Sequence, residues 1–308
     1  MARRRTGRPV HGWVVLDKPA GLTSSRAVAI VRRHFDAVKA GHGGTLDPLA
    51  TGILPIALGE ATKTVAWAMS GRKTYRFRLR WGETRSTDDA EGEIVATSAV
   101  RPDAEAVAAA LPRLTGTVMQ RPPSYSAVKL AGRRAYALAR SGEPVELAPR
   151  AVEIHALHLL GRPDTDHADF EMVAGKGTYV RAVGRDLAVM LGTCAHVAAL
   201  RRLAVGRFTL DQAISLDQIE ALGHSTGALK YLLPIETALD DIPALALAEA
   251  EARRLRQGQI VVPALAVDRQ WLESLGDGTT VRATTGCMLV ALTEVAAGGL
   301  RPVRVINL

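Results

Sequence analysis

Cysteines, aromatic residues and long hydrophobic runs are all scarce in this 308-residue sequence. Cys194 and Cys287 are its two cysteines, too few for a disulfide framework or a cysteine-rich zinc or iron–sulfur site. No apolar run approaches the roughly 18 residues that a membrane-spanning helix requires. The first apolar segment is interrupted by Asp17 and Lys18 before it could serve as a secretion signal. We therefore expect a cytoplasmic protein that does not associate with a membrane.

Acidic residues are also in deficit, because 31 Asp and Glu face 39 Lys and Arg, which leaves a net charge of +8. Such a balance suits a polyanionic partner. Arginine outnumbers lysine, which favours bidentate phosphate contacts but is also expected of a GC-rich genome. Four arginines lie within the first eight residues. We expect residues 1–11 to form a flexible basic tail that adds non-specific affinity for nucleic acid.

The composition is that of a globular protein, with 47% hydrophobic and 23% charged residues. From Lys73 to Trp81, aromatic and aliphatic residues alternate with arginines, which predicts a half-buried strand. Thr23 is a suitable N-cap for a helix that follows a short strand at 13–16. Further strands are predicted at 93–96, 116–120, 152–160, 169–173 and 200–208, and helices at 103–111 and 180–191. This irregular mixture predicts an α+β fold with a central mixed, largely antiparallel sheet flanked by helices.

A change of character near residue 240 divides the chain. The segment Asp240 to Pro243 resembles a linker, and residues 12–240 before it would form one large domain. Residues 244–308 after it contain a predicted helix at 247–257 and short strands separated by glycine turns. We expect this part to be a small, β-rich domain.

The segment GHGGTLDPLATG, residues 41–52, combines four glycines with one proline and predicts a loop of demanding backbone geometry. Asp47 lies inside it, and His42 stands among the glycines. An aspartate followed by proline also begins many helices, so Asp47 is equally suited to a purely structural N-cap. The glycines favour close approach of the backbone to a ligand, with Asp47 as the carboxylate presented to it.

The commoner enzyme motifs are missing: there is no glycine-rich dinucleotide fingerprint, Walker lysine, HExxH or GxSxG. His155 and His158 fall on opposite faces of a predicted strand, which favours a structural role over metal binding. Cys194 and His196 form a pair with no third ligand suggested nearby. We expect no metal site.

Three segments combine cations with aromatic or hydroxyl side chains in a way that suits unstacked RNA, although each could also be a solvated surface. They are residues 72–80, 121–129 and 176–181. Tyr179 and Arg181 flank one residue and would share a face if the last segment is extended.

Taken together, these segments resemble the TruB family of tRNA pseudouridine synthases. Seven motifs occur in the family's order, and the resemblance covers nearly all of residues 12–215. They are LDKPAGLTS (16–24), GHGGTLDPLATGILPIALGEATK (41–63), KTYRFRLRWG (73–82), TDDAEG (87–92), RPPSYSAVKLAGRRAYALAR (121–140), GKGTYVRAVGRDL (175–187) and HVAALRRLAVGRF (196–208).

The resemblance implies a pseudouridine synthase fold for residues 12–240, with an RNA-contacting insertion at about 121–150, and a PUA-like RNA-binding domain at 244–308. It implies that uridine 55 in the T-loop of tRNA is isomerised to pseudouridine after being flipped out of its loop. No cofactor is implied. The implied partner is the T-arm stem-loop of tRNA, and a monomer without any required protein partner is expected.

The resemblance also assigns residues. Asp47 would be the essential nucleophile or base, anionic at an ordinary pKa near 4, and Arg181 would pair with it. Tyr75 would stack on the target uracil and accept its C5 proton. By the same resemblance, His42 would fill the vacated position, Tyr179 and Leu200 would complete the uridine pocket, and Lys18 would support it.

Two other functions remain open from the sequence. A guide-dependent box H/ACA-type synthase shares the catalytic motifs, although the 121–140 segment resembles the stand-alone bacterial enzymes. A tRNA-binding or tRNA-folding module that needs no chemistry also fits the charge, and this role can coexist with catalysis.

Overall fold

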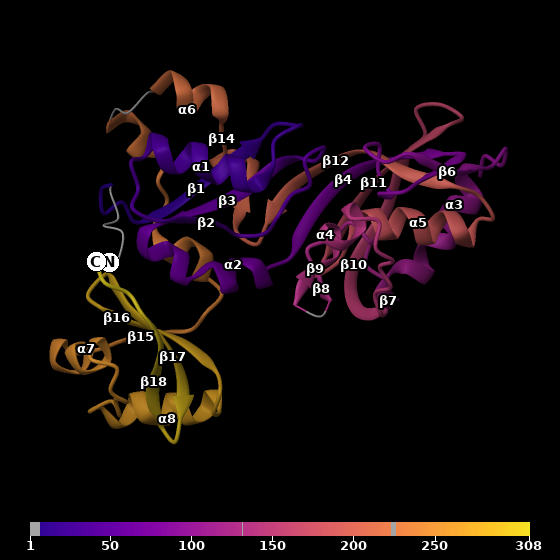
Figure 1. The fold of residues 1–308 in the computed structure, drawn as a ribbon. Helices are drawn as coiled ribbons and strands as arrows, with labels where there is room; N and C mark the ends of the chain where they lie inside the picture. Colours follow the sequence, from indigo (N-terminus) through magenta and orange to yellow (C-terminus); the bar gives the residue numbers. More distant parts are fainter. Residues whose placement is uncertain (1–6, 131, 223–225) are drawn as a thin grey trace.

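The computed structural model describes residues 7–130, 132–222 and 226–308. It contains a large mixed sheet with helices and a separate small β domain (Figure 1). The helices are α1 Ser24–His34, α2 Val65–Ser70, α3 Ala104–Ala110, α4 Ala135–Arg140, α5 Val180–Met190, α6 Leu216–Leu222, α7 Glu249–Arg256 and α8 Ala266–Leu275. The predicted α+β class is confirmed.

Ten strands form the large sheet, in the order β14-β1-β3-β12-β4-β11-β10-β7, with β2 beside β3 and β13 beside β12. The β1–β14 and β3–β12 pairs are parallel and the others antiparallel, as predicted. The strands are β1 Gly12–Lys18, β2 Ala40–His42, β3 Thr51–Leu58, β4 Lys73–Trp81, β7 Gly116–Gln120, β10 Arg150–Gly161, β11 His167–Ala174, β12 Ala195–Val205, β13 Phe208–Thr209 and β14 Ile214–Ser215.

This sheet has two halves that meet between β3 and β12. We call β14, β1, β3 and β2 the Asp47 half, because the loop carrying Asp47 lies between β2 and β3. The remaining strands are the Tyr75 half, because β4 carries Tyr75. The two halves are joined by two residue pairs, Arg201 with Thr51 and Arg202 with Gly52. In Figure 1 the two halves lie side by side, with α1 and α2 on one and α3 to α5 on the other.

The alternation from Lys73 to Trp81 is confirmed by the burial of β4. Phe77, Leu79 and Trp81 are buried, whereas Arg76 and Arg78 are exposed and pair with carboxylates of β11. Phe77 stacks on Phe170 of β11 with ring centroids 5.2 Å apart. The buried face of β4 contributes to the main hydrophobic cluster, together with residues of α1, α3 and α5.

Two predictions differ from the structure: the strand at 200–208 and the extent of the N-terminal tail. The predicted strand at 200–208 is instead the longer β12 followed by a turn at Gly206 and the short β13, because Gly206 has a φ of +53°. Residues 1–6 of the expected basic tail lie outside the described residues. Residues 8–10 are not free, since Arg8 donates a backbone hydrogen bond to Asp36 at 2.6 Å and Val10 is 7% exposed. Residues 8–10 therefore belong to the folded large domain.

The small C-terminal domain begins at β15 Ala244–Ala246, which directly follows the expected linker. Its sheet has the order β15-β16-β17-β18, with β16 Thr280–Thr285, β17 Met288–Ala296 and β18 Gly299–Val305. It packs on the Asp47 half, below α2 in Figure 1. Leu289, Leu292 and Ile306 join a hydrophobic cluster that contains Trp13 and Ile53. Lys63 also donates a hydrogen bond to the Val305 carbonyl at 2.7 Å.

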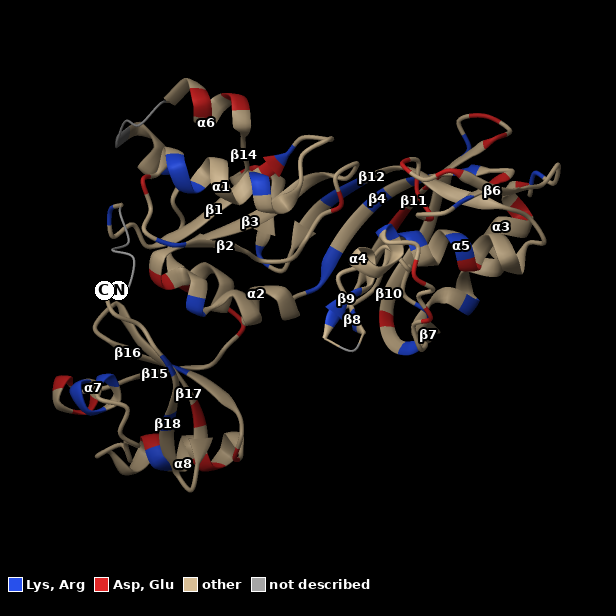
Figure 2. Cartoon of the chain, viewed as in Figure 1, with Lys and Arg blue, Asp and Glu red and all other residues tan. Residues whose placement is uncertain are grey.

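Two small hairpins project from the large domain. One pairs β5 Glu83–Arg85 with β6 Ile94–Thr97, and the other pairs β8 Lys129–Leu130 with β9 Arg133–Arg134. The second lies in the segment expected to contact RNA, and Lys and Arg mark it in Figure 2. Within the described ranges, no helix is both long and apolar enough to span a membrane.

Candidate active site

Asp47 lies in an irregular loop between β2 and β3, not at the start of a helix. The structural N-cap interpretation of Asp47 is therefore wrong. The hydroxyl of Ser24 at the start of α1 holds the preceding residue, accepting from Leu46 N at 2.8 Å and donating to Leu46 O at 2.9 Å. This pair of bonds fixes the backbone immediately before the carboxylate.

Arg181 pairs with Asp47, with 3.0 Å between Arg181 Nε and Asp47 Oδ2. The N–H is not aligned for a good hydrogen bond, so the contact is best described as an ion pair. Arg181 is 4% exposed, and its other nitrogens donate to Thr87 O at 2.7 Å and Tyr125 O at 2.9 Å. One buried guanidinium thus connects the Asp47 loop with two distant segments of the Tyr75 half.

A second carboxylate, Asp89, shares this guanidinium at 3.5 Å from Arg181 Nε and is itself 2% exposed. Its Oδ1 accepts hydrogen bonds from the Thr87 hydroxyl and from Glu91 N. Asp89 was not singled out from the sequence, although it belongs to the TDDAEG motif. Its proximity to Asp47 joins positions 42 residues apart, which no local pattern reveals.

Burial raises the pKa of the Asp47 carboxyl above its usual range. The Arg181 charge opposes this effect, the Asp89 charge adds to it, and Lys18 opposes it more weakly. The prediction of an ordinary pKa for Asp47 is therefore wrong, because burial raises it. The Asp47 side chain still keeps 34% of its surface exposed, so a substrate can reach it.

Lys18 is fully buried, and its ammonium donates to the carbonyls of Pro19, Leu22 and Pro48 at 2.9, 2.8 and 3.2 Å. Burial lowers its pKa to about 8, while the Asp47 charge acts in the opposite direction. Lys18 therefore ties the end of β1 to the residue that follows Asp47 and contributes positive charge nearby.

Tyr75 and His42 approach the loop from the two halves of the sheet. Tyr75 lies on the buried side of β4, where it is half-buried and interacts with the guanidinium of Arg202. His42 ends β2, and burial and the Arg202 charge lower its pKa. Among the described residues, His42 Nδ1 has no hydrogen-bond partner although it is buried.

Tyr179 is the N-cap of α5, and Arg181 lies in the first turn of that helix. The expectation that these two residues share one face of an extended segment is wrong, because the helix begins at Val180. Gln120 of β7 holds this helix start: its amide accepts from Tyr179 N at 2.8 Å and donates to Tyr179 O at 3.2 Å. The Tyr179 ring lies beside Arg150, 5.4 Å from its guanidinium carbon.

Leu200 lies on β12 opposite Phe77 and is 7% exposed. It lines a groove of about 980 Å³ that also reaches Leu49 and Thr51, shortly after Asp47. Leu200 therefore lies near the Asp47 loop, although this groove does not include Asp47 itself.

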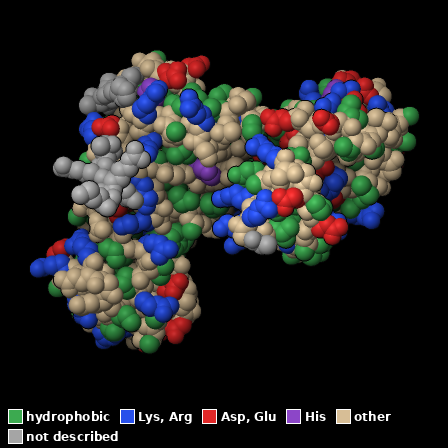
Figure 3. Space-filling view, in the orientation of Figure 1, with side chains coloured by type: hydrophobic (Ala, Val, Ile, Leu, Met, Phe, Trp, Pro, Cys, Tyr) green, Lys and Arg blue, Asp and Glu red, His purple; other side chains and the backbone are tan. Residues whose placement is uncertain are grey.

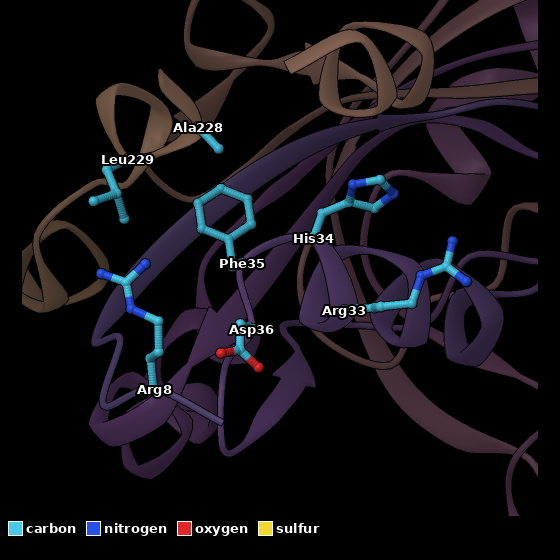
Figure 4. A pocket seen from close by; sticks show the side chains of 7 residues that line it. All are labelled: Arg8, Arg33, His34, Phe35, Asp36, Ala228 and Leu229. Carbon is cyan, nitrogen blue, oxygen red and sulfur yellow. The ribbon is translucent and has the colours of Figure 1, made fainter. Parts of the chain in front are cut away.

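The space-filling view shows a hollow between the two halves, with Lys and Arg side chains at its edge and a histidine inside it (Figure 3). A smaller cavity of about 350 Å³ lies elsewhere, at the end of α1. Arg8 and Arg33 line that cavity, but their guanidinium groups lie far apart and do not converge on one point (Figure 4). The convergent charged groups are at Asp47.

The model of the TruB family pseudouridylate synthase N-terminal domain matches residues 32–180, and that of the tRNA pseudouridylate synthase B C-terminal domain matches residues 181–240. The chain belongs to the TruB family. The first match ends at Val180, where α5 begins, and the second begins at Arg181, which pairs with Asp47.

Curated TruB relatives match the chain along its whole length. A protein of Rhodospirillum rubrum named tRNA pseudouridine synthase B is 54% identical over 308 residues, covering 100% of both chains. A protein of Bradyrhizobium diazoefficiens with the same name is 56% identical and covers 99% of this chain and 88% of its own.

Solved structures share the fold. The crystal structure of a Cbf5-Nop10-Gar1 complex contains a chain with a TM-score of 0.69 and 25% identity, covering 92% of this chain and 78% of its own. A structure of an H/ACA RNP bound to a substrate RNA containing 2′-deoxyuridine gives a TM-score of 0.72 at 19% identity, covering 100% and 92%. The pseudouridine synthase fold expected from the sequence is therefore confirmed.

Proposed function

We propose that this TruB family member isomerises uridine 55 in the T-loop of tRNA to pseudouridine. The observation that carries the proposal is the ion pair between the buried Arg181 and Asp47, whose side chain remains 34% exposed. The names of full-length relatives at 54% and 56% identity support the substrate. The net charge of +8 suits an RNA partner.

The reaction is an internal exchange of one glycosidic bond. The bond from C1′ to N1 breaks, a bond from C1′ to C5 forms, the C5 proton is lost and N1 gains a proton. The atoms balance without a cofactor, so the protein must supply a nucleophile or base and acid–base groups. In this proposal Asp47 acts as that nucleophile or base, at C1′, at C6 or at the 2′ proton.

The other residues hold the uridine and the carboxylate. Arg181 keeps Asp47 oriented and ionised against the burial that raises its pKa. Tyr75 stacks on the uracil and accepts the C5 proton. A flipped base leaves its stack at a cost of a few kcal/mol, which His42 offsets by filling the vacated position.

The remaining pocket and RNA contacts follow the same proposal. Tyr179 and Leu200 complete the uridine pocket, and Lys18 supports the Asp47 loop. The insertion at 121–150 and the domain at 244–308, which we propose to be PUA-like, contact the RNA outside the pocket. Exposed cations at Lys129, Arg133 and Arg134 suit phosphate contacts.

The test is an unmodified T-arm stem-loop incubated with the purified protein, without guide RNA or any other protein. Pseudouridine formation is followed by release of tritium from C5-labelled uridine, and its position is mapped by chemical labelling and primer extension. We expect modification at position 55 only. Modification that requires a guide RNA and partner proteins would instead support a box H/ACA-type enzyme.

A tRNA-folding contribution can coexist with this activity. Complementation of a synthase-deficient strain by an Asp47→Ala variant would reveal such a role, whereas failure of that variant would leave catalysis as the function that the cell needs.

A further inference from the structure

Arg202 lies where the two halves of the sheet join. On one side its backbone is paired with Gly52 of β3, and on the other with Tyr75 of β4. Arg202 is 1% exposed, so a large charged side chain fills the interior of this junction. Neither the sequence pattern nor the proposed chemistry gives this residue a role.

The buried guanidinium of Arg202 forms hydrogen bonds with backbone carbonyls of the Asp47 loop and of β3. It donates to Gly44 O at 2.9 Å, to Thr45 O at 3.2 Å and to Ile53 O at 2.8 Å. The first two carbonyls precede Asp47 and the third follows it. The backbone on both sides of the carboxylate is thus fixed by one side chain that β12 supplies.

Backbone geometry shows how closely the parts approach. Gly52 has a φ of +97°, and a Cβ there would lie 2.1 Å from the Arg202 carbonyl oxygen. Gly44 has a φ of +117°, which also disfavours a side chain. Two of the glycines in the loop are therefore required by the contact with Arg202 or by their own backbone conformation.

The same guanidinium interacts with the phenol of Tyr75. Across the described ranges, no carboxylate forms an ion pair with Arg202, although the Asp47 charge is close enough to stabilise its protonated form. A buried cation without a paired anion is costly, which argues against a role in stability alone.

We propose that Arg202 is a positioning residue for the isomerisation, which clamps the Asp47 loop against β4 so that Asp47 and Tyr75 face the same uridine. The inference rests on the proposed function, because it assumes that both side chains act on one nucleoside. It concerns placement: Arg202 itself need not touch the substrate.

The test compares Arg202→Met, Arg202→Lys and a control variant in single-turnover assays with enzyme in excess over tRNA, and measures their kcat and KM separately in multiple-turnover assays. Methionine removes the charge and the donors, whereas lysine keeps the charge but cannot bond three carbonyls in fixed directions. Arg101 is the control, because it also donates to two backbone carbonyls, those of Ser98 and Val100 at 2.8 and 3.2 Å, but it pairs with Asp166 and lies outside the site. The thermal midpoint of each variant is measured alongside.

For Arg202→Met we expect the rate to fall about 100-fold, the scale of a small misplacement of catalytic groups, with KM changed less than about threefold. Arg202→Lys should lie between it and the unchanged protein. Arg101→Met should keep the rate within about threefold of the unchanged protein, even if its thermal midpoint falls as far as that of Arg202→Met. If Arg202→Met does not fold, a loss of about tenfold in Arg202→Lys supports the proposal and a full rate overturns it.

A coupling experiment separates placement of Tyr75 from general support of the fold. In a Tyr75→Phe background, Arg202→Lys should cost less than about threefold, because part of what it disrupts is already missing. Full multiplication of the two losses would contradict the proposal, as would a rise in KM at constant kcat. If the unchanged protein modifies no tRNA, the proposed function is wrong. If the unchanged protein is active and the Arg202 variants react at the same rate, only the inference about Arg202 is wrong.

Discussion

The Asp47 site and the C-terminal domain handle charge in opposite ways. Around Asp47, the side chains of Lys18, Asp89, Arg181 and Arg202 are all at most 4% exposed. In residues 244–308, which the structure describes throughout, the buried polar side chain is the neutral Thr293, and ion pairs such as Arg301–Glu294 lie at the surface. Burying charge costs free energy. The large domain therefore bears this cost around the residues to which we assign the chemistry.

The same difference separates two kinds of support. In the C-terminal domain, hydrophobic residues such as Val281, Ala283 and Leu300 are fully buried and hold the sheet together. Around Asp47, hydrogen bonds from buried cations to backbone carbonyls hold the loop. Mutations should therefore change the reaction rate at the first region and only the stability at the second.

Among substitutions of the residues that support Asp47, we expect the largest loss of reaction rate from Arg181→Met. It leaves Asp47 and Asp89 close together without their shared cation, so the rate should fall by about 10²–10³, the scale of losing one electrostatic stabiliser. The pKa of Asp47 should also rise, because Arg181 is the main group that lowers it. Since the ionised carboxylate is the active form, activity should be lost at higher pH on acidification than in the unchanged protein.

Single-turnover rates from pH 5 to 8 measure both effects, with Arg181→Lys as the control that retains a positive charge. An acidic limb that stays at the same pH in Arg181→Met would show that Asp47 is not the group that titrates.

A smaller effect is expected from Gln120→Leu. Gln120 is 2% exposed and holds both backbone groups of Tyr179, so its loss leaves them unpaired and frees the start of α5. We expect a rate loss of about tenfold, because a buried hydrogen bond of about 1–3 kcal/mol is lost at the helix that positions Arg181. Thr115→Val is the control, because the hydroxyl of this exposed residue bonds Leu111 O directly before β7 and outside the site; equal rates in both variants would refute the role of Gln120.

Much of this architecture is predictable from the sequence because it depends on local patterns. Alternation gives β4 at Lys73–Trp81 and β7 at Gly116–Gln120 with the bounds that were predicted. Thr23 caps α1 as expected, accepting from Arg26 N at 3.2 Å. The resemblance to a family placed Asp47 and Arg181 in one site, and the structure brings them together.

What the sequence did not reveal depends on contacts between distant segments. Arg202 follows Arg201 in an ordinary strand, and no local pattern tells that one side chain is buried and the other pairs with Asp17. The pKa of Asp47 depends on burial and on Asp89, neither of which is visible locally. The start of α5 at Val180 is also set by tertiary contacts, because Gln120 satisfies its N-cap backbone.

The buried Lys18 should make the free energy of unfolding depend on pH. Its pKa is lowered from 10.5 to about 8 in the folded protein, so between these values the unfolded chain binds the additional proton. Its contribution therefore favours the folded state above about pH 10.5 and is lost as the pH falls through about 8. We expect the free energy of unfolding, measured in urea from pH 7 to 10, to rise more steeply with pH than in Lys18→Met. Parallel curves would contradict the burial of a charged Lys18.

The smallest effect is expected at Thr293→Val in the C-terminal domain. The variant removes the hydrogen bond from the Thr293 hydroxyl to Val281 O, which is 2.9 Å long, and leaves that carbonyl with one partner fewer. We expect a loss of about 1 kcal/mol of stability and an unchanged rate of modification. A large rate loss with intact folding would show that the C-terminal domain takes part in the chemical step.

We propose that the Asp47 carboxylate drives the isomerisation of uridine 55, and replacing that carboxylate tests this role. Unmodified tRNA is incubated with the unchanged protein or with Asp47→Asn, which has nearly the same shape but no charge, and every uridine is mapped for pseudouridine. With the unchanged protein we expect pseudouridine at position 55 alone, and its formation should slow by about 10⁴ or more in the variant, the scale of losing a catalytic carboxylate. Modification at full rate by Asp47→Asn, or at other positions only, would contradict it.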